Sequence, residues 1–473
     1  GKKRGGVMDR IVTGYSLFVA STPSFWVAMV LLMVFAVKLH WFPIGFSVPI
    51  GMDAGAISIA DRIRHAVLPA AALSITGIAS IALHTREKLI EVMESDYVLF
   101  ARARGEADWA ILRRHGLRNI LLPAMTLQFS SVSEIIGGSV LVEQVFSYPG
   151  LGQAAVTAGL GSDTFRDHSR DGGHRRRGKS CGKHFVRCDR SEDPGGGEAE
   201  MMKNRRRKSF ALLILAAGLL VLIAVLGSFW KEAAIQTDFT RKNLAPCIQY
   251  PFGTDWMGRD MFVRTIAGLS LSIRIGLLTA AVSAAAAFLM GLCAAVCGKA
   301  ADSIVQMLID IVMGIPHMLL LILISFACGR GFWGVVWGIA FTHWASLARL
   351  IRGEVLQLKQ SQYVKIAEKL GKGKFYIAFC HMAPNLIPQF ITGLVLLFPH
   401  AILHEASITF LGFGLSSESP AIGVILSESM KYLAMGKWWL ALFPGLFLVG
   451  TVLLFHYIGQ ALCRLLDPGS VHE

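Results

Sequence analysis

Long apolar runs alternate with short polar, basic segments along this chain. Most of these runs approach or exceed the roughly 20 residues that a helix needs to cross the hydrocarbon core of a bilayer. Three precede residue 150 and six follow residue 205; they cover residues 11–37, 66–84, 120–142, 209–229, 269–297, 303–327, 332–350, 385–407 and 438–462. A soluble core imitates one or two such runs but not nine. The pattern therefore predicts an all-α polytopic membrane protein with about nine transmembrane helices, three in a first half and six in a second.

Two of the polar segments are written to the same plan. Residues 86–119 and 352–385 align at a single offset of 266 residues. The alignment pairs Arg86 with Arg352, Ser95 with Ser361, Tyr97 with Tyr363, Ala101 with Ala367, Gly105 with Gly371, His115 with His381 and Asn119 with Asn385. A second pattern, Glu143…Gly150-Leu-Gly152, recurs as Glu405…Gly412-Phe-Gly414. This internal repeat indicates that the two halves are homologous.

Composition and charge agree with a membrane protein. The chain is 53% hydrophobic and 16% charged, with a mean hydropathy of +0.53. Its formal net charge is +14, and basic residues gather near the N-terminus, in both repeated segments and at 203–208. Such clusters mark the cytoplasmic ends of membrane helices. A nucleic-acid surface is the competing interpretation, but no basic run is interleaved with aromatic residues. We therefore expect a lipid bilayer as partner and no nucleic acid.

The orientation set by these charges requires one more inward crossing between residues 152 and 205. Residues 165–197 contain almost no aliphatic side chain and cannot hide their backbone polar groups from lipid. We therefore predict a partial first domain at 1–164, a polar segment at 165–200 that is disordered or out of frame, and a second domain at 201–473. One hypothesis is that a frame slip at about 165–192 replaced a lost helix and joined two once separate subunits. The alternative is a genuine soluble linker.

Two motifs in the polar segment resemble chemical sites. Residues 173–180 match the phosphate-binding pattern GxxxxGK[ST], yet no apolar strand precedes them and no helical pattern follows. The spacing of Cys181, His184 and Cys188 fits no standard zinc-ligand pattern. An NTP-hydrolysing enzyme built on residues 173–180 remains as an alternative function. The leading expectation is a protein without catalytic residues, metal or cofactor.

Several motifs together make the chain resemble the permease subunits of bacterial ABC importers of the peptide/nickel family, with two subunit types in tandem. The first half carries SDYVLFARARG (95–105) and VEQVFSYPGLG (142–152); the second carries FGTDWMGRD (252–260), SQYVKIAEKLG (361–371) and HEASITFLGFG (404–414). The resemblance covers nearly everything outside 165–197. It implies a multi-pass protein of the bacterial inner membrane that moves peptides, nickel or another chelated metal into the cytoplasm.

The same resemblance implies two kinds of protein partner. Separate cytoplasmic ABC ATPase subunits would supply the energy, and an extracytoplasmic substrate-binding protein would deliver the cargo. The chain opens at Gly1 without a methionine, so we expect a truncated N-terminus. Against the family pattern, the first domain would lack its two opening helices and its last helix. A non-functional fusion product is therefore the alternative to a working permease.

In this family a loop containing Ala-x-x-x-Gly forms a short coupling helix that docks on the ATPase. The resemblance assigns this role to Ala101 with Gly105, and to Ala367 with Gly371. Tyr97, His115, Tyr363 and His381 complete the two predicted ATPase-coupling loops. Glycine suits the break after a helix, and a small alanine permits close approach of the partner. Neither copy keeps the general Glu-Ala-Ala opening of the family.

Ionisable residues inside the apolar runs are candidates for the substrate path, because at membrane depth they usually face water or a polar partner. These residues are Glu134, Asp310, His317, His400 and His404. Helix–helix hydrogen bonding is the competing role. His400 and His404 stand one turn apart beside Glu405, a spacing that suits a metal. An interfacial histidine pair without a ligand is the favoured interpretation, so no metal site is predicted.

Overall fold

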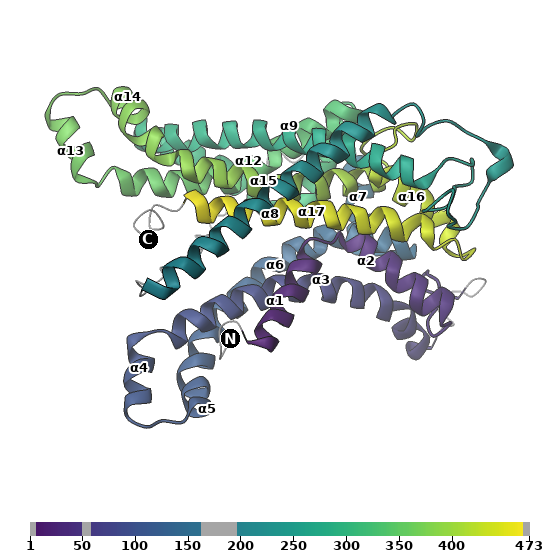
Figure 1. Cartoon of the computed structure of the whole chain (residues 1–473), viewed down its shortest axis with the longest axis horizontal. Coiled ribbons are helices and arrows are strands. Elements are labelled where there is room, and N and C mark those ends of the chain that lie inside the picture. Colours follow the sequence, from purple (N-terminus) through teal and green to yellow (C-terminus); the bar gives the residue numbers. More distant parts are fainter. Residues whose placement is uncertain (1–5, 50–57, 162–195, 467–473) are drawn as a thin grey trace.

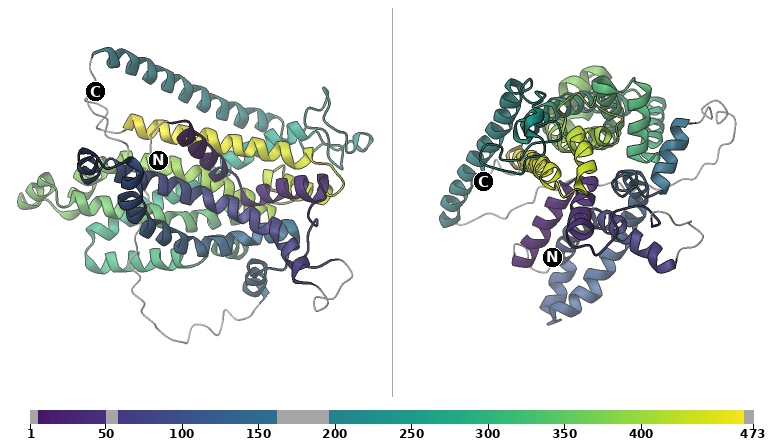
Figure 2. Two further views of the ribbon diagram at one scale, coloured as in Figure 1. Left: turned by 90° about the horizontal axis from the view of Figure 1, so that it is seen from below. Right: turned by 90° about the vertical axis from the view of Figure 1, so that its right-hand side faces the viewer.

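The computed structural model describes residues 6–49, 58–161 and 196–466. Within these ranges the chain is helical, and its only β-pairing is an isolated bridge between Thr254 and Asp260. The all-α prediction is therefore confirmed for the described residues. Figures 1 and 2 show the helices of the second half lying against those of the first, with most of them running along the long axis.

The helices of the first half begin with a broken pair and continue with two long helices that flank a hairpin. They are α1 (Val7–Ala20), α2 (Ser24–Leu31), η1 (Leu32–Lys38), α3 (Ile59–Met93), α4 (Asp96–Ala103), α5 (Asp108–Ile111), η2 (Leu112–Gly116), α6 (Leu117–Phe146) and α7 (Leu151–Gly161).

The second half contains the same series, preceded by two long helices and followed by one. Its elements are α8 (Gly196–Phe229), η4 (Phe239–Arg241), α9 (Met261–Val296), α10 (Lys299–Gly314), α11 (His317–Ala327), α12 (Gly331–Leu358), α13 (Gln362–Lys369), α14 (Lys374–Tyr376), η5 (Ile377–Met382), α15 (Ala383–Phe410), α16 (Ile422–Leu433) and α17 (Trp439–Leu466).

Five helices in the described residues are long and apolar enough to cross a membrane, or up to seven spans if each of two bent pairs counts as one. The predicted runs at 120–142 and 332–350 fall in α6 and α12, which have 30 and 28 residues but are not among those five. Several membrane spans are thus supported, while the count of nine in a three-plus-six arrangement remains a prediction.

Two of the predicted runs, 11–37 and 303–327, are not straight helices. The first bends by 103° between α1 and α2, and the second bends by 101° between α10 and α11. In each case a proline, Pro23 or Pro316, occupies the residue just before the second helix. Proline lacks a backbone N–H and favours the start of a helix over its interior. The apolar runs alone did not predict these breaks.

The two bent pairs occupy equivalent places in the two halves. The same offset of 293 residues separates Asp9 from Asp302 and Pro23 from Pro316. Both aspartates receive two hydrogen bonds from an arginine on the next long helix, Arg86 of α3 or Arg352 of α12. The order of elements therefore matches α1–α7 with α10–α16. A single-offset alignment misses this because the offset changes from 293 to 266 and then to 262 along the chain.

The two halves share one apolar core. The rings of Phe25 on α2 and Phe410 on α15 stack with centroids 4.4 Å apart. Trp26 Nε1 donates a buried hydrogen bond to the carbonyl of Ala441 on α17, at 3.0 Å. The indole also lies so close to Gly445 that a Cβ there would meet Trp26 Nε1 at 1.6 Å. Small residues let membrane helices approach closely, and Gly445 serves that purpose between the halves.

A network of buried charges fastens the loop before α9 to α16. The Asp255 carboxylate accepts hydrogen bonds from Arg259 Nε at 2.6 Å and Arg264 Nη1 at 2.9 Å. Glu428 on α16 lies 3.1 Å and 2.7 Å from the same two guanidinium groups. Two carboxylates thus neutralise two guanidinium groups in a largely buried setting. The first Asp and the Arg of the FGTDWMGRD motif, Asp255 and Arg259, belong to this network, at the end of the molecule opposite α4 and α13 (Figure 1).

The central polar segment carried several expectations that lie outside the described residues. These are the proposed lost helix at about 165–192, the phosphate-binding pattern at 173–180, and the cluster of Cys181, His184 and Cys188. The domain limits at 164 and 200 likewise remain predictions.

Candidate functional site

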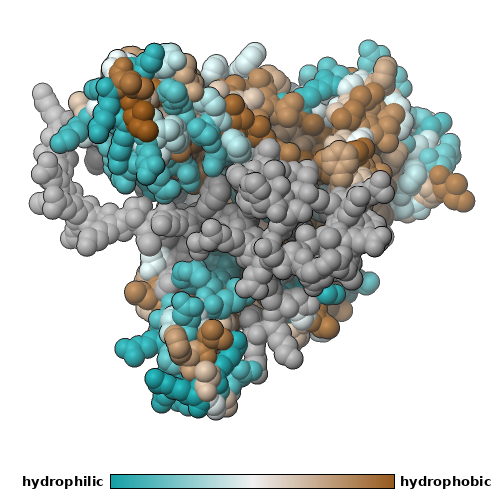
Figure 3. Space-filling model, turned by 60° about the vertical axis from the view of Figure 1, so that its left-hand side comes forward, coloured by the Kyte–Doolittle hydropathy of each residue, from teal (hydrophilic) through white to brown (hydrophobic). Residues whose placement is uncertain are grey.

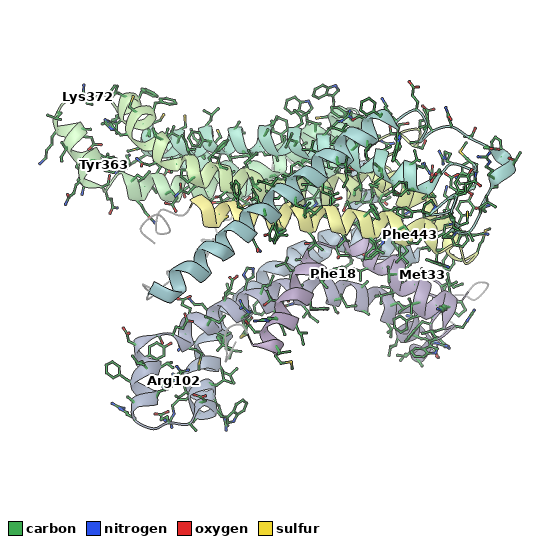
Figure 4. All side chains as sticks on the ribbon, viewed as in Figure 1. Phe18, Met33, Arg102, Tyr363, Lys372 and Phe443 are labelled. Carbon is green, nitrogen blue, oxygen red and sulfur yellow. The ribbon has the colours of Figure 1, made fainter. Side chains whose placement is uncertain are left out.

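The repeated basic segments form two hairpins at the same end of the molecule. The α4–α5 hairpin joins α3 to α6, and the α13–α14 hairpin joins α12 to α15 (Figure 1). Figure 4 labels Arg102 on the first hairpin and Tyr363 and Lys372 on the second. Each hairpin returns to its long helix through a π-helical turn, η2 or η5. Placement at one end is what a single partner, or a matched pair of partners, requires.

The short helix in each hairpin ends in the same way. Gly105 and Gly371 have φ of +80° and +75°, in the left-handed region that favours glycine. The amide after each glycine, in Glu106 or Lys372, donates to the carbonyl of Ala101 or Ala367, at 3.2 and 3.1 Å. The glycine amides donate to residues 102 and 368. This is the Schellman arrangement, so the Ala-x-x-x-Gly spacing has a direct structural cause.

A polar latch fixes each hairpin to the long helix that follows it. Asn119 Nδ2 donates to the Tyr97 hydroxyl at 3.1 Å and to the His115 carbonyl at 2.9 Å. Asn385 Nδ2 makes the same two bonds, to the Tyr363 hydroxyl at 3.2 Å and to the His381 carbonyl at 2.7 Å. In each copy one amide therefore ties the short helix to the start of α6 or α15. The repeat of Tyr, His and Asn in the sequence reflects this latch.

The inner and outer faces of the short helices differ. Val98 and Ala101 on α4, and Val364 and Ala367 on α13, are buried against the rest of the hairpin. On the outer face Phe100 is 69% exposed and the matching Ile366 is 57% exposed. The second short helices add exposed Trp109 and Phe375 at matching positions. Figure 3 shows apolar patches among the polar surface at this end.

Charged groups border the apolar patch of the first hairpin. Arg102 Nε lies 3.7 Å from Asp108, and Arg114 Nη1 lies 3.8 Å from Glu106. Both pairs are within the hairpin and largely exposed, so they contribute little to its stability. Their guanidinium groups remain at the surface of the same hairpin that carries the exposed Phe100. An apolar patch with a basic border suits a protein groove that has an acidic rim.

The candidates for the substrate path do not form one cluster. The side chain of Glu134, on α6, lies outside the described residues. Asp310 on α10 is 71% exposed, and its carboxylate accepts a hydrogen bond from Arg349 Nη2 at 2.8 Å. His400 is exposed on α15, one turn before His404. Among the candidates whose side chains the structure describes, His317 and His404 share a cluster.

The third member of their cluster is His343 on α12, which no sequence pattern indicated. The His317 ring lies 4.7 Å from each of the His343 and His404 rings, and those two lie 5.0 Å apart, measured between centroids. One potential ligand atom from each residue lies within 4.8 Å of the others. Three separate helices supply the three rings, so no spacing along the chain could have revealed them.

The two glutamates of the repeated Glu…Gly-x-Gly pattern bind their own half. Glu143 accepts hydrogen bonds from the amides of Gly152 at 3.1 Å and Gln153 at 2.6 Å, at the start of α7. Glu405 accepts from the hydroxyls of Ser272 at 2.6 Å and Thr409 at 3.1 Å. Both glutamates are buried. Their hydrogen bonds give them a structural role at the end opposite the hairpins.

Comparison with known proteins places this arrangement in a family. The model of the family described as "Binding-protein-dependent transport system inner membrane component" matches residues 1–232 and 285–471. A dipeptide transport system permease of Bacillus subtilis is 32% identical over 258 residues, which is 53% of this chain and 81% of that protein. An oligopeptide transport system permease of the same organism is 30% identical over 269 residues, covering 57% and 88%. A probable D,D-dipeptide transport system permease of Escherichia coli is 30% identical over 265 residues, covering 55% and 89%.

Proposed function

Because the chain belongs to the family of inner membrane components of binding-protein-dependent transport systems, we propose that it forms the membrane pathway for peptides entering a bacterial cell. The members of this family are the membrane components of ABC importers, and the relatives described above are transport permeases. Their names specify peptides, so peptide is the cargo we propose in preference to nickel. An extracytoplasmic binding protein would deliver it.

The observation that supports the energy-coupling proposal is the pair of matched hairpins at one end of the molecule. Each presents an exposed apolar residue, Phe100 or Ile366, on a short helix closed by a left-handed glycine. We propose that two ATPase subunits, or two copies of one, grip these hairpins. The latch residues would not contact the ATPase directly. They hold each short helix against its long helix; they are Tyr97 and His115 in the first hairpin, and Tyr363 and His381 in the second.

The latches explain how a movement of the ATPase would reach the middle of the membrane. The Asn119 latch joins the first hairpin to α6, and the Asn385 latch joins the second to α15. With 30 residues, α6 extends for about 45 Å at the usual rise per residue. A tilt of the hairpin therefore moves the far end of the helix as a rigid body. This is the hinge or shear motion that alternating access needs, and it requires no covalent chemistry from this chain.

The outer faces of the short helices provide the test of this proposal. Phe100→Glu combined with Ile366→Glu places two charges where apolar contact with the ATPase is proposed, without touching buried Val98 or Val364. We expect uptake of a labelled dipeptide, in cells that supply the ATPase and binding protein, to fall at least tenfold. Ile248→Glu is the matched control, because Ile248 is fully exposed in the loop between α8 and α9 at the other end. Undiminished uptake by the double variant, at equal membrane content, would contradict the coupling role.

We also propose that two subunits have been joined in this chain, supported by the two stretches of family match and the equivalence of α1–α7 with α10–α16. Sequencing the encoding DNA around codon 165 tests whether a frame slip lies at the junction. An intact reading frame there would refute the slip. A fused chain that carries no peptide, in cells with all partners present, would instead support the non-functional alternative.

A further inference from the structure

Three histidines from three helices meet where α11 begins, just after the break at Pro316. His317 is the first residue of α11, while His343 and His404 come from the middle of α12 and from α15. Their potential ligand atoms all lie within 4.8 Å of one another. Two nitrogens bound to one ion at about 2.1 Å are separated by roughly 3.4 Å in tetrahedral geometry. Side-chain rotations that move each nitrogen by about 1 Å would therefore close the cluster around an ion.

The hydrogen bonds around the cluster leave free the atoms that a metal needs. His343 Nδ1 lies 3.0 Å from the Ile339 carbonyl oxygen. That oxygen can only accept a hydrogen bond, so Nδ1 must carry the ring proton. That tautomer leaves the lone pair of Nε2 available, which is the usual arrangement of a metal-binding histidine. Thr342 Oγ1, 3.1 Å from the same Nδ1, can turn its own proton elsewhere. The ring of His343 is thus oriented before any ligand arrives.

The other two rings also have nitrogens to offer. His317 Nε2 is buried and has no hydrogen-bond partner among the described residues. A buried polar atom left unpaired is destabilising, so its position calls for a ligand. His404 Nδ1 lies 3.2 Å from Met318 Sδ, which leaves its Nε2 free in turn and brings a thioether to the edge of the cluster.

We propose that His317, His343 and His404 bind one divalent transition-metal ion of the class that prefers imidazole, such as Zn²⁺, Co²⁺ or Ni²⁺. Three protein ligands leave a fourth position open for water or for a donor atom of a bound molecule. Glu405, next to His404, is not among the potential ligands, and its carboxylate accepts hydrogen bonds from the hydroxyls of Ser272 and Thr409 instead. The ligands are therefore neutral, and the ion keeps its full charge.

The position of the site gives the ion a structural consequence. Gly137 on α6 of the first half approaches this break so closely that a Cβ there would lie 3.3 Å from Pro316 Cβ and 3.6 Å from Met318 Cβ. An ion that joins α11, α12 and α15 thus fixes the surface on which the first half rests. This goes beyond a peptide pathway and does not depend on which peptide is carried.

The test measures Co²⁺ binding to the full chain in lipid nanodiscs, purified without an oligohistidine tag. Co²⁺ reports its own coordination through visible d–d absorption, and elemental analysis gives the stoichiometry. Cys293 and Cys297 are replaced by serine in all samples, because their sulfurs lie 3.9 Å apart and form a competing pair. Cys181 and Cys188 are also replaced, because thiolates in general bind Co²⁺. We expect one Co²⁺ per chain with a low-symmetry, four-coordinate spectrum.

The variants separate this cluster from the histidine pair that the sequence suggests. His343→Gln, His317→Gln and His404→Gln should each weaken Co²⁺ binding at least about tenfold, the lower end of what even an outer-shell change costs. His400→Gln is the matched control, because it lies on α15 one turn from His404 but outside the cluster. Loss of binding in His400→Gln with full binding in His343→Gln would overturn the proposal. Absence of any d–d band in the parent chain would overturn it as well.

A second measurement guards against variants that fail to fold. Ligands that bind the native state raise the unfolding temperature. Zn²⁺ should therefore raise the unfolding midpoint of the parent chain, whereas Mg²⁺, which prefers oxygen ligands, should not. An equal response to both ions would show nonspecific binding and refute the site.

Discussion

Arg352 donates from Nε and Nη2 to the two carboxylate oxygens of Asp302, at 2.5 and 2.9 Å, and so ties the start of α10 to α12. Arg86 on α3 donates the same bidentate pair of hydrogen bonds to the Asp9 carboxylate on α1, from Nε at 2.6 Å and from Nη2 at 2.7 Å. In both halves the arginine belongs to the helix that leads into a hairpin, and the aspartate belongs to the first segment of a bent helix pair. The pair therefore links the helix that leads into each hairpin, the contact proposed for the ATPase, to the break.

Disrupting either pair should weaken this link. Asp302→Asn keeps the shape of the side chain and removes the charge, and we expect it to lower the free energy of unfolding by about 1–2 kcal/mol, since the pair is half-buried and two-pronged. Thermal unfolding in nanodiscs measures this. Glu91→Gln is the control, because its pair with Lys88 is exposed and should contribute less than about 0.5 kcal/mol. If the swap of Asp302→Arg with Arg352→Asp stays as unstable as Asp302→Asn, attraction between the groups is not the cause.

The glycines that end the short helices give a second prediction. Gly105→Ala and Gly371→Ala introduce a Cβ that meets nothing within 4 Å, so the whole effect comes from the positive φ. We expect each to cost about 1 kcal/mol of local stability and to reduce peptide uptake. Gly353→Ala is the matched control, because its Cβ also meets nothing but its backbone is helical. Hydrogen exchange of residues 96–106 and 362–372 reports the loss; unchanged exchange would contradict the strain.

The third prediction concerns the close contact between the two halves at Gly445. Gly445→Ala would place a Cβ at 1.6 Å from the Trp26 indole, so the indole must move and its bond to Ala441 must break. Overpacking of this kind typically costs about 1–3 kcal/mol. Gly450→Ala on the same helix meets no neighbour and should be neutral or slightly stabilising. The unfolding midpoints of the two variants should differ by several degrees, and equal midpoints would show that α2 and α17 are not held at this point.

The fourth prediction concerns the network of buried charges around Asp255. Asp255→Asn leaves Arg259 and Arg264 to share the single carboxylate of Glu428 in a buried setting. Removing one partner from a buried ionic group typically costs about 3–5 kcal/mol. Glu232→Gln, at an exposed position, should change stability by less than about 0.5 kcal/mol. A cost as small for Asp255→Asn, measured by thermal unfolding, would mean that water reaches the network.

The hairpins were predictable because their structure is local. The Ala-x-x-x-Gly spacing, the Tyr–Asn latch and the π-helical return all lie within 34 residues and occur twice, so one copy checks the other. The long apolar helices followed from composition in the same way. Neither inference required knowledge of which helix packs on which.

The helix breaks and the long-range contacts could not be predicted from the sequence. They depend on contacts between distant segments or on the exact position of a proline. Pro23 and Pro316 stand at corners of about 100°, whereas Pro69, Pro388, Pro399 and Pro444 lie inside continuous helices. An apolar run containing proline therefore does not by itself reveal a break. The ion pair of exposed Asp310 with Arg349 likewise joins residues far apart in the sequence, and the substrate-path role of Asp310 stays a prediction. His343 lies in the apolar run at 332–350, and the packing of α12 against α11 and α15 brings it beside His317 and His404.

The corners at Pro23 and Pro316 have one more consequence. When a helix ends inside a bilayer and another begins, the carbonyl groups of the last turn and the amides of the next helix's first turn lack partners. The hydrocarbon core cannot form hydrogen bonds with them. Water or polar side chains must reach both places. Each half therefore has one position, at Pro23 or Pro316, where backbone polar groups within a bilayer would need water or polar side chains as partners.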